Sequence, residues 1–304
     1  VCVFMQIPNM VHIVIQKILQ ATGNMIAPMW FQIAGVVFNF VFDPLLIFGI
    51  GPFPKMGVVG AAVATVLGYV VSTIIALIQL FLTKQKVKPV FKNCLEPQMI
   101  KLIFSYGLPS FVMNALGAFT VNFANMFLVR YSDTAVAFFG AYFKVQQLIF
   151  MTVNGLIQGC LPIMRFNYRA KEYGRLKQAN KSGTIIATVM MIVGMLLVLI
   201  FPKEILFLFS ASEEMCAFGV PAMRIMSLGF VFSGFSAMIA TYEQATDSIM
   251  PGVVVQLLRQ GVLLVPVIWL LNSAVQMTGI WLAFPITEFV TFLVAVVFAK
   301  IKNH

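Results

Sequence analysis

The sequence predicts an all-α polytopic membrane protein, and three observations lead to this fold class. Only 10% of the 304 residues are charged and 61% are hydrophobic, whereas an ordinary soluble domain carries about 25% charged residues. Unbroken apolar stretches approach the roughly 20 residues that a helix needs to cross about 30 Å of hydrocarbon. The alternating segments of about ten residues that a membrane β-barrel requires are not found. This composition excludes a water-soluble enzyme, a disulfide scaffold and a disordered regulator.

Nine transmembrane helices are predicted, joined mostly by short connections. We expect them at about residues 1–20, 28–49, 58–82, 100–129, 134–163, 182–202, 215–242, 252–271 and 279–300. Residues 84–99 form the longest polar connection. Between Pro202 and Glu214 we expect a short interfacial helix that inserts the apolar residues Phe207–Phe209 into the membrane.

The net charge of +10 is concentrated in particular loops. Of the 20 Lys and Arg residues, 11 lie in residues 84–101 and 165–181, and Lys300 and Lys302 lie at the end of the chain. Basic residues gather in the cytoplasmic loops of membrane proteins. We therefore expect these segments and the C-terminus in the cytoplasm, and no nucleic acid as a partner. Aromatic residues between the bases of residues 165–181 are typical of a helix lying on an anionic leaflet.

An internal repeat relates the first three helices to the last three. Gln20–Thr22 ahead of Pro28 recurs as Gln244–Thr246 ahead of Pro251. A second pattern recurs in the same order: Gly57, Ala61 and Thr65 match Gly279, Ala283 and Thr287. Both patterns recur at an offset of about 223 residues, with the helices in the same direction. Parallel repeats related by an axis along the membrane normal are a transporter architecture.

The repeat predicts a domain organisation. Residues 1–83 would be the last three helices of an N-terminal lobe, residues 84–99 a cytoplasmic linker, and residues 100–304 a complete six-helix C-terminal lobe. Val1 already lies inside an apolar segment. We therefore expect three further helices ahead of it, which gives twelve helices in two parallel six-helix repeats.

Four stretches of the chain carry a family resemblance. They are Phe38–Phe48 (FNFVFDPLLIF), Gly57–Thr65 (GVVGAAVAT), Gly107–Pro109 (GLP) and Leu161–Lys171 (LPIMRFNYRAK). Through them the chain resembles the bacterial branch of the multidrug and toxic compound extrusion (MATE) family, from its fourth to its twelfth helix. The resemblance implies export of amphipathic, often cationic drugs in exchange for H⁺ or Na⁺. It also implies a monomeric, multi-pass protein of the inner cell membrane, with drugs and the lipid bilayer as partners and no cofactor besides the coupling ion.

Asn39 and Asp43 are the first candidate site residues. They are four residues apart, so they share one helix face, and Asp43 is the only acid in the first three predicted helices. A charged residue inside a membrane is costly and is a functional hypothesis by default. Alternatively, Asp43 only satisfies backbone groups that Pro44 leaves without partners. The resemblance places Asn39 and Asp43 in a hydrogen-bonded network of the N-terminal lobe, and Thr65 either joins that network or packs between helices.

The C-terminal lobe departs from part of the family. Gly117 stands where some members carry a Glu, and no acid lies between Arg224 and Glu243, where some carry an Asp. These departures disfavour a Na⁺ site in this lobe and favour H⁺ as the coupling ion. Among the charged residues inside its predicted helices, Lys144, Arg259 and Glu288 remain as candidates. We expect one of the two bases to pair with Glu288, in a structural or a coupling role.

Three asparagines are candidate cavity-lining residues. Asn114, Asn122 and Asn125 lie in one predicted helix, and lipid would not tolerate their amides. We expect them to face a central cavity or a neighbouring helix.

Other functions remain to be weighed. A lipid or lipid-linked oligosaccharide flippase would need several bases for pyrophosphate, and only Lys144, Arg224 and Arg259 are candidates. The chain could also be a non-functional fragment, because without three helices one lobe would stay open. An enzyme is not expected, since the sequence holds no paired acids, phosphate loop or Ser/His arrangement. A metal site is not expected either, because the chain has only two histidines and its four cysteines are scattered.

Overall fold

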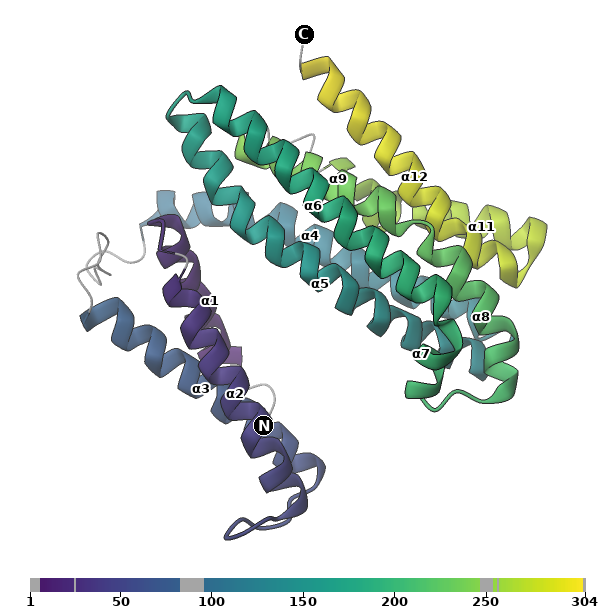
Figure 1. The fold of residues 1–304 in the computed structure, drawn as a ribbon, viewed down its shortest axis with the longest axis horizontal. Helices are drawn as coiled ribbons and strands as arrows, with labels where there is room; N and C mark the ends of the chain where they lie inside the picture. Colours follow the sequence, from purple (N-terminus) through teal and green to yellow (C-terminus); the bar gives the residue numbers. More distant parts are fainter. Residues whose placement is uncertain (1–5, 25, 83–95, 247–253, 256, 303–304) are drawn as a thin grey trace. The chain divides into compact units, whose positions relative to one another are not determined.

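The computed structural model describes residues 6–24, 26–82, 96–246, 254–255 and 257–302. Within these ranges the chain is a succession of helices without a strand (Figure 1). It divides into two compact units, Val1–Cys94 and Leu95–His304, which are described separately below. The all-α fold class predicted from the sequence is confirmed.

The described residues of unit 1 form three helices, α1 (Gln6–Ala21), α2 (Ile26–Phe48) and α3 (Val58–Leu82). Its small apolar core includes Leu19 of α1, Phe31 of α2 and Ala76 of α3. The Asn24 side chain accepts a hydrogen bond from the Ala27 amide at 3.1 Å, and so satisfies one of the backbone donors at the start of α2.

Glycines allow α2 and α3 to pack closely. A Cβ on Gly60 of α3 would contact the backbone of Leu46 of α2, and a Cβ on Gly35 of α2 would contact Ser72 of α3. The Ser72 hydroxyl donates to the Phe31 carbonyl at 3.0 Å. Small residues at such crossings let two backbones approach, which is how helices associate in lipid.

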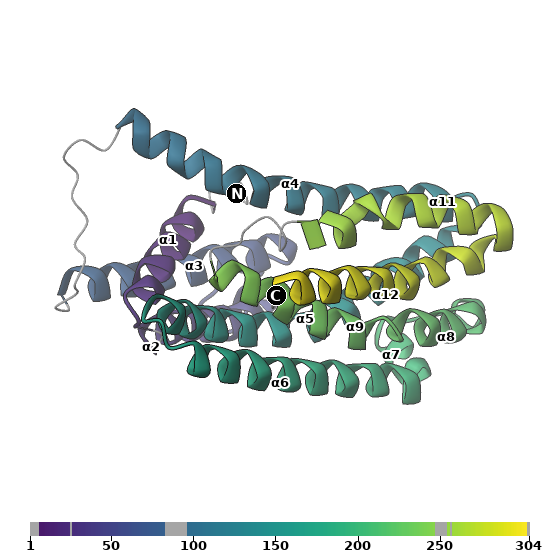
Figure 2. The ribbon, with the colours of Figure 1, turned by 90° about the horizontal axis from the view of Figure 1, so that it is seen from above.

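Unit 2 contains the remaining helices. They are α4 (Pro97–Leu128), α5 (Asp133–Arg169), α6 (Tyr173–Ile200), α7 (Pro202–Leu208), α8 (Glu213–Ser227), α9 (Phe230–Ala245), η1 (Leu258–Val262), α11 (Leu264–Val275) and α12 (Met277–Lys302). Within this unit, α4 and α6 lie on opposite sides, with α5, α9 and α12 between them (Figures 1 and 2). Aromatic side chains fill the core, including Phe138, Tyr142, Phe230 and Trp281.

Six helical segments of the described residues are long and apolar enough to cross a membrane. They are Ile26–Phe48, Val58–Phe81, Asp133–Arg169, Tyr173–Ile200, Glu213–Ala245 and Met277–Phe298. Two shorter apolar helices, Ala115–Leu128 and Leu264–Val275, accompany them. This set is compatible with the predicted helices, of which the first and the eighth include residues outside the described part.

The helix predicted over residues 215–242 is interrupted. α8 ends at Ser227 and α9 begins at Phe230. At the break, a Cβ on Gly229 would come within 3.2 Å of Pro285 Cα and 3.3 Å of Glu288 Cγ, both in α12. The close approach of α12 therefore explains why a glycine stands here, and helices commonly bend at such positions.

The helix predicted over residues 252–271 also differs from a regular helix. Its described part contains the π-helical turn η1, in which Gly261 leaves the helical conformation, before α11 begins. A Cβ on Gly261 would lie 2.8 Å from the Thr120 hydroxyl of α4. Turns of this kind are frequent at functional sites.

The expectation of a separate surface helix over residues 165–181 is wrong. α5 runs on to Arg169 and α6 begins at Tyr173. Between them, the amide of Lys171 donates to the Tyr168 carbonyl and that of Glu172 to the Asn167 carbonyl. With Lys171 at a positive φ of 60°, these bonds form a Schellman motif that ends α5. The bases therefore lie on the ends of two long helices.

The Gly60→Ala substitution is expected to destabilise unit 1. Its Cβ would meet the Leu46 backbone, which cannot move aside as a side chain can, and overpacking of this kind costs about 1–3 kcal/mol. Gly155→Ala in α5 is the control, because its Cβ would meet no atom within 4 Å. Thermal unfolding in detergent, followed by helical circular dichroism, measures both. An unfolding temperature of Gly60→Ala equal to that of the control would contradict this packing.

Candidate functional site

The first candidate site lies in unit 1, between α2 and α3. The Asn39 amide Nδ2 donates to Asp43 Oδ1 at 3.2 Å and to Thr65 Oγ1 at 3.3 Å. The Thr65 hydroxyl in turn donates to the Ala61 carbonyl at 2.9 Å. The structure therefore brings together all three residues that the sequence proposed for this site, and each is half-buried.

Helix packing explains why these side chains meet. Gly68 of α3 faces Asn39, and a Cβ at Gly68 would lie 3.2 Å from Asn39 Cβ. The glycine thus leaves the space in which the Asn39 side chain crosses to α3. The alternative role for Asp43 was to satisfy backbone groups that Pro44 leaves without partners, because proline has no N–H to donate within the helix. The hydrogen bond found for Asp43 among the described residues is instead to the Asn39 side chain.

This arrangement leaves the Asp43 carboxylate with acceptor capacity. Both N–H donors of the Asn39 amide are used, whereas an ionised carboxylate can accept about four hydrogen bonds. Within the described residues, Asn39 accounts for one of them. The rings of Phe38 and Phe42 stack at 4.1 Å beside this pair on α2. A half-buried carboxylate on a helix that also carries stacked aromatic rings suits a proton or an organic cation.

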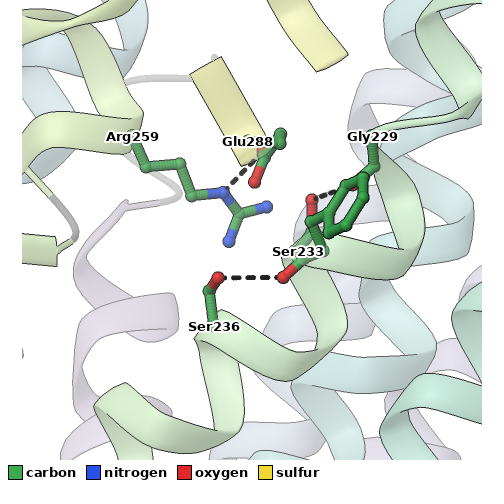
Figure 3. Close-up of polar contacts among 6 residues, drawn as sticks. Gly229, Ser233, Ser236, Arg259 and Glu288 are labelled. Carbon is green, nitrogen blue, oxygen red and sulfur yellow. Dashed lines mark hydrogen bonds and ion pairs between the residues drawn. The ribbon is translucent and has the colours of Figure 1, made fainter. Parts of the chain in front are cut away.

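The second candidate site is an ion pair in unit 2. Arg259 Nε of η1 lies 2.9 Å from Glu288 Oε1 of α12, and the two side chains are 17% and 14% exposed. Figure 3 shows Arg259 and Glu288 extending toward each other. The guanidinium carbon also lies 4.8 Å from the ring centroid of Phe150 of α5. Arg259, rather than Lys144, therefore contacts Glu288, and Lys144 is exposed on α5.

Two serines of α9 lie near this ion pair (Figure 3). Ser233 donates to the Gly229 carbonyl at 3.1 Å and Ser236 to the Phe232 carbonyl at 2.8 Å, so both are bonded within α9 (Figure 3). By contrast, three buried oxygens of α12 have no hydrogen-bond partner among the described residues: Glu288 Oε2, Thr287 Oγ1 and Thr291 Oγ1. An unsatisfied buried polar group costs about 1–3 kcal/mol, which makes these oxygens candidates for hydrogen bonds with water.

The three predicted cavity residues on α4 differ in their surroundings. The Asn122 side chain is exposed and donates to the Ala118 carbonyl of its own helix at 3.0 Å. Asn125 Oδ1 is buried without a partner among the described residues. The side chain of Asn114 lies outside the described residues. That these residues line a central cavity stays a prediction.

Sequence reasoning missed two features of unit 2. Phe150 contacts Arg259 from another helix, and no local pattern identifies it. Glu243 only marked the end of an acid-free stretch in the sequence and its burial was not predicted, although the residue is 2% exposed. An acid at the end of an apolar helix was the signal that could have found Glu243.

A family model and several known proteins are similar to this chain. The MatE family model matches residues 109–270. The chain is 26% identical over 277 residues to the multidrug export protein MepA of Staphylococcus aureus strain bovine RF122 / ET3-1, and covers 60% of it with 90% of its own length. MepA of Staphylococcus saprophyticus is 26% identical over 286 residues, with 93% and 61% covered. The chain thus spans about 60% of the length of these relatives.

Solved structures show the same fold. An outward-facing structure of a multidrug resistance MATE family transporter of the MOP superfamily matches with a TM-score of 0.84 at 21% identity, over 96% of this chain and 65% of that one. A MOP superfamily transporter from Pyrococcus furiosus Vc1 (DSM3638) matches with a TM-score of 0.85 at 21% identity, with the same coverage. At such identities, the likeness shows the fold alone.

Breaking the Arg259–Glu288 pair from one side is expected to destabilise unit 2 more than removing both charges. Arg259→Gln leaves the Glu288 charge uncompensated, and a buried charge left in this way costs about 3 kcal/mol or more. The same reasoning applies to Glu288→Gln. The double variant is expected to lie closer to wild type than either single variant in thermal unfolding in detergent.

The control for this cycle is the exposed pair of charges on α7, Lys203→Gln and Glu204→Gln, whose effects should be small and additive. Additive losses for Arg259→Gln and Glu288→Gln would show that the two charges do not depend on each other.

Proposed function

We propose, because this chain belongs to the MatE family, that it forms part of a secondary antiporter that exports amphipathic, often cationic drugs in exchange for H⁺. The protein would lie in the cell membrane as a monomer, with its C-terminus in the cytoplasm. The relatives named multidrug export proteins support drugs as the substrate class. The proposal includes no enzymatic reaction and no cofactor besides the coupling ion.

The observation that carries the proposal is the Asn39–Asp43–Thr65 cluster. Antiport needs a group that binds the ion and the substrate alternately. Asp43 is the only acid among residues 1–83, and a neutral amide is its described partner, so its negative charge is available to a proton or to a cationic drug. Stacked Phe38 and Phe42 beside it favour a substrate with an apolar, aromatic body.

The charges of unit 2 favour H⁺ over Na⁺. Gly117 and the acid-free stretch from Arg224 to Glu243 remove two carboxylates that could hold a metal ion. Glu288, the acid inside the last predicted helix, is 2.9 Å from Arg259. A hard cation prefers several oxygen ligands, and an adjacent guanidinium repels it.

The flippase alternative receives less support. Of its three candidate bases, Arg259 is bonded to Glu288 and Arg224 Nε donates to the Leu199 carbonyl at 3.3 Å. A site for pyrophosphate would need these charges to converge on the ligand.

Asp43→Asn is expected to reduce drug efflux to background. The amide keeps the size and hydrogen-bonding capacity of the side chain but cannot ionise, so expression and unfolding temperature should stay near wild type. Efflux of a fluorescent cationic dye from cells that express the protein as its gene encodes it measures the effect. Asp133→Asn, at an exposed position in the first turn of α5, is the control. Normal efflux by Asp43→Asn would remove this residue from the mechanism.

The driving ion can be tested in vesicles. We expect efflux under an imposed pH gradient without Na⁺, since a carboxylate that binds a proton needs no cage of metal ligands, and no efflux under a Na⁺ gradient without a pH gradient. Transport of the dye by reconstituted protein is the measurement. Activity in the second condition alone would overturn the choice of H⁺.

A further inference from the structure

A cavity of about 560 Å³ lies within unit 2, apart from both sites described above. The end of α5, the start of α6 and the end of α9 form its walls. Cavities of roughly 300–1,000 Å³ are the size of small-molecule sites. Its polar lining carries charges of both signs, which neither the ion pair nor the Asp43 cluster uses.

The inner part of this cavity offers oxygen acceptors. Glu243, 2% exposed, lines it from α9. Asn180 of α6 lines it too, and its Oδ1 is buried without a hydrogen-bond partner among the described residues. A carboxylate and an amide oxygen together suit a primary ammonium group, which has three N–H donors. Tyr168, Tyr173 and Tyr242 add aromatic rings to the lining, and such rings attract cations.

The outer part of the cavity offers the opposite charge. Lys177 and Lys181, one helical turn apart on α6, line it and are exposed. Exposed lysines at this spacing suit a phosphate group as point charges. They also disfavour a ligand that carries only positive charge, such as a cationic drug. The lining therefore fits a ligand with a phosphate at one end and an ammonium at the other.

The position of the cavity along the helices indicates the source of this ligand. α5 contains 37 residues and is thus about 55 Å long, whereas the hydrocarbon core of a bilayer is about 30 Å thick. At least one end of α5 therefore reaches beyond the hydrocarbon. The apolar part of α6 begins after Lys181, near Gly183, so both lysines lie at the level of lipid headgroups.

We propose that this cavity binds the headgroup of a zwitterionic phospholipid, with a primary ammonium against Glu243 and Asn180 and the phosphate at Lys177 and Lys181. Phosphatidylethanolamine has this chemistry. Phosphatidylglycerol has the phosphate without the ammonium, and phosphatidylcholine has a cation without N–H donors. A lipid bound here would connect the ends of α5, α6 and α9.

Native mass spectrometry of the detergent-solubilised protein tests the proposal. The protein is titrated with each of the three lipids, carrying the same acyl chains, and the bound fraction gives the apparent affinity. Phosphatidylethanolamine is expected to bind most tightly. Glu243→Gln should weaken its binding about tenfold, the factor that corresponds to about 1.4 kcal/mol and to one charge-assisted hydrogen bond. The affinity for phosphatidylglycerol should not change.

Substitutions of exposed lysines test the phosphate contact without disturbing the packing of the protein. Lys177→Gln with Lys181→Gln should weaken phosphatidylethanolamine and phosphatidylglycerol alike, whereas Lys203→Gln on α7 should affect neither. Soluble phosphoethanolamine should displace the lipid, and inorganic phosphate at the same concentration should not.

Several results would overturn the proposal. Equal binding of the three lipids, or an unchanged lipid preference in Glu243→Gln, would exclude recognition of the ammonium. Unchanged binding in the double lysine variant would exclude the phosphate contact. Displacement by inorganic phosphate would reduce the site to an anion site, and equal affinity for soluble phosphoethanolamine and the lipid would assign it to a soluble ligand.

Discussion

The structure depends on the cost of unpaired polar groups in hydrocarbon, where each unsatisfied backbone N–H or C=O costs several kcal/mol. Helices satisfy the backbone, and most hydroxyls then bond within their own helix. Thr65, Thr188, Ser233, Ser236 and Thr241 each donate to the carbonyl four residues earlier. Carboxylates, amides and guanidinium groups cannot all be satisfied in this way. Some of their partners lie on other helices, as for Asn39 with Thr65 and for Arg259 with Glu288, and these partnerships hold the candidate sites together.

The carboxylates of the two units have different kinds of partner, which suits them to different roles. Asp43 bonds to a neutral amide, whereas Glu288 bonds to a cation. A second cation about 4 Å from the Arg259 guanidinium would meet a repulsion of about 4 kcal/mol at an effective dielectric constant near 20. No such repulsion comes from Asn39. Under the proposed function, exchange of a proton for a cationic substrate would therefore be easier at Asp43, and the ion pair of unit 2 is better suited to holding η1 against α12.

Sequence reasoning succeeded where the pattern is local and stopped where packing decides. The i, i+4 spacing placed Asn39 and Asp43 on one face, and the apolar runs identified the helices. It left open whether Lys144 or Arg259 meets Glu288, because that depends on which helices pack together and how each is rotated. The breaks at Gly229 and Gly261 were missed for the same reason, since each is explained by a neighbouring helix distant in sequence. Glu243 was missed because its burial depends on α5 and α6.

Glycines connect the packing of the helices to the chemistry of both sites. A Cβ added at Gly68 would lie 3.2 Å from Asn39 Cβ, and one added at Gly229 would lie 3.3 Å from Glu288 Cγ. In each unit, the helix that carries a candidate site residue thus packs against a glycine of the neighbouring helix. Small residues at these positions let the helices associate, and they also fix where the carboxylate or its amide partner can lie. The contacts that assemble each unit therefore position its site.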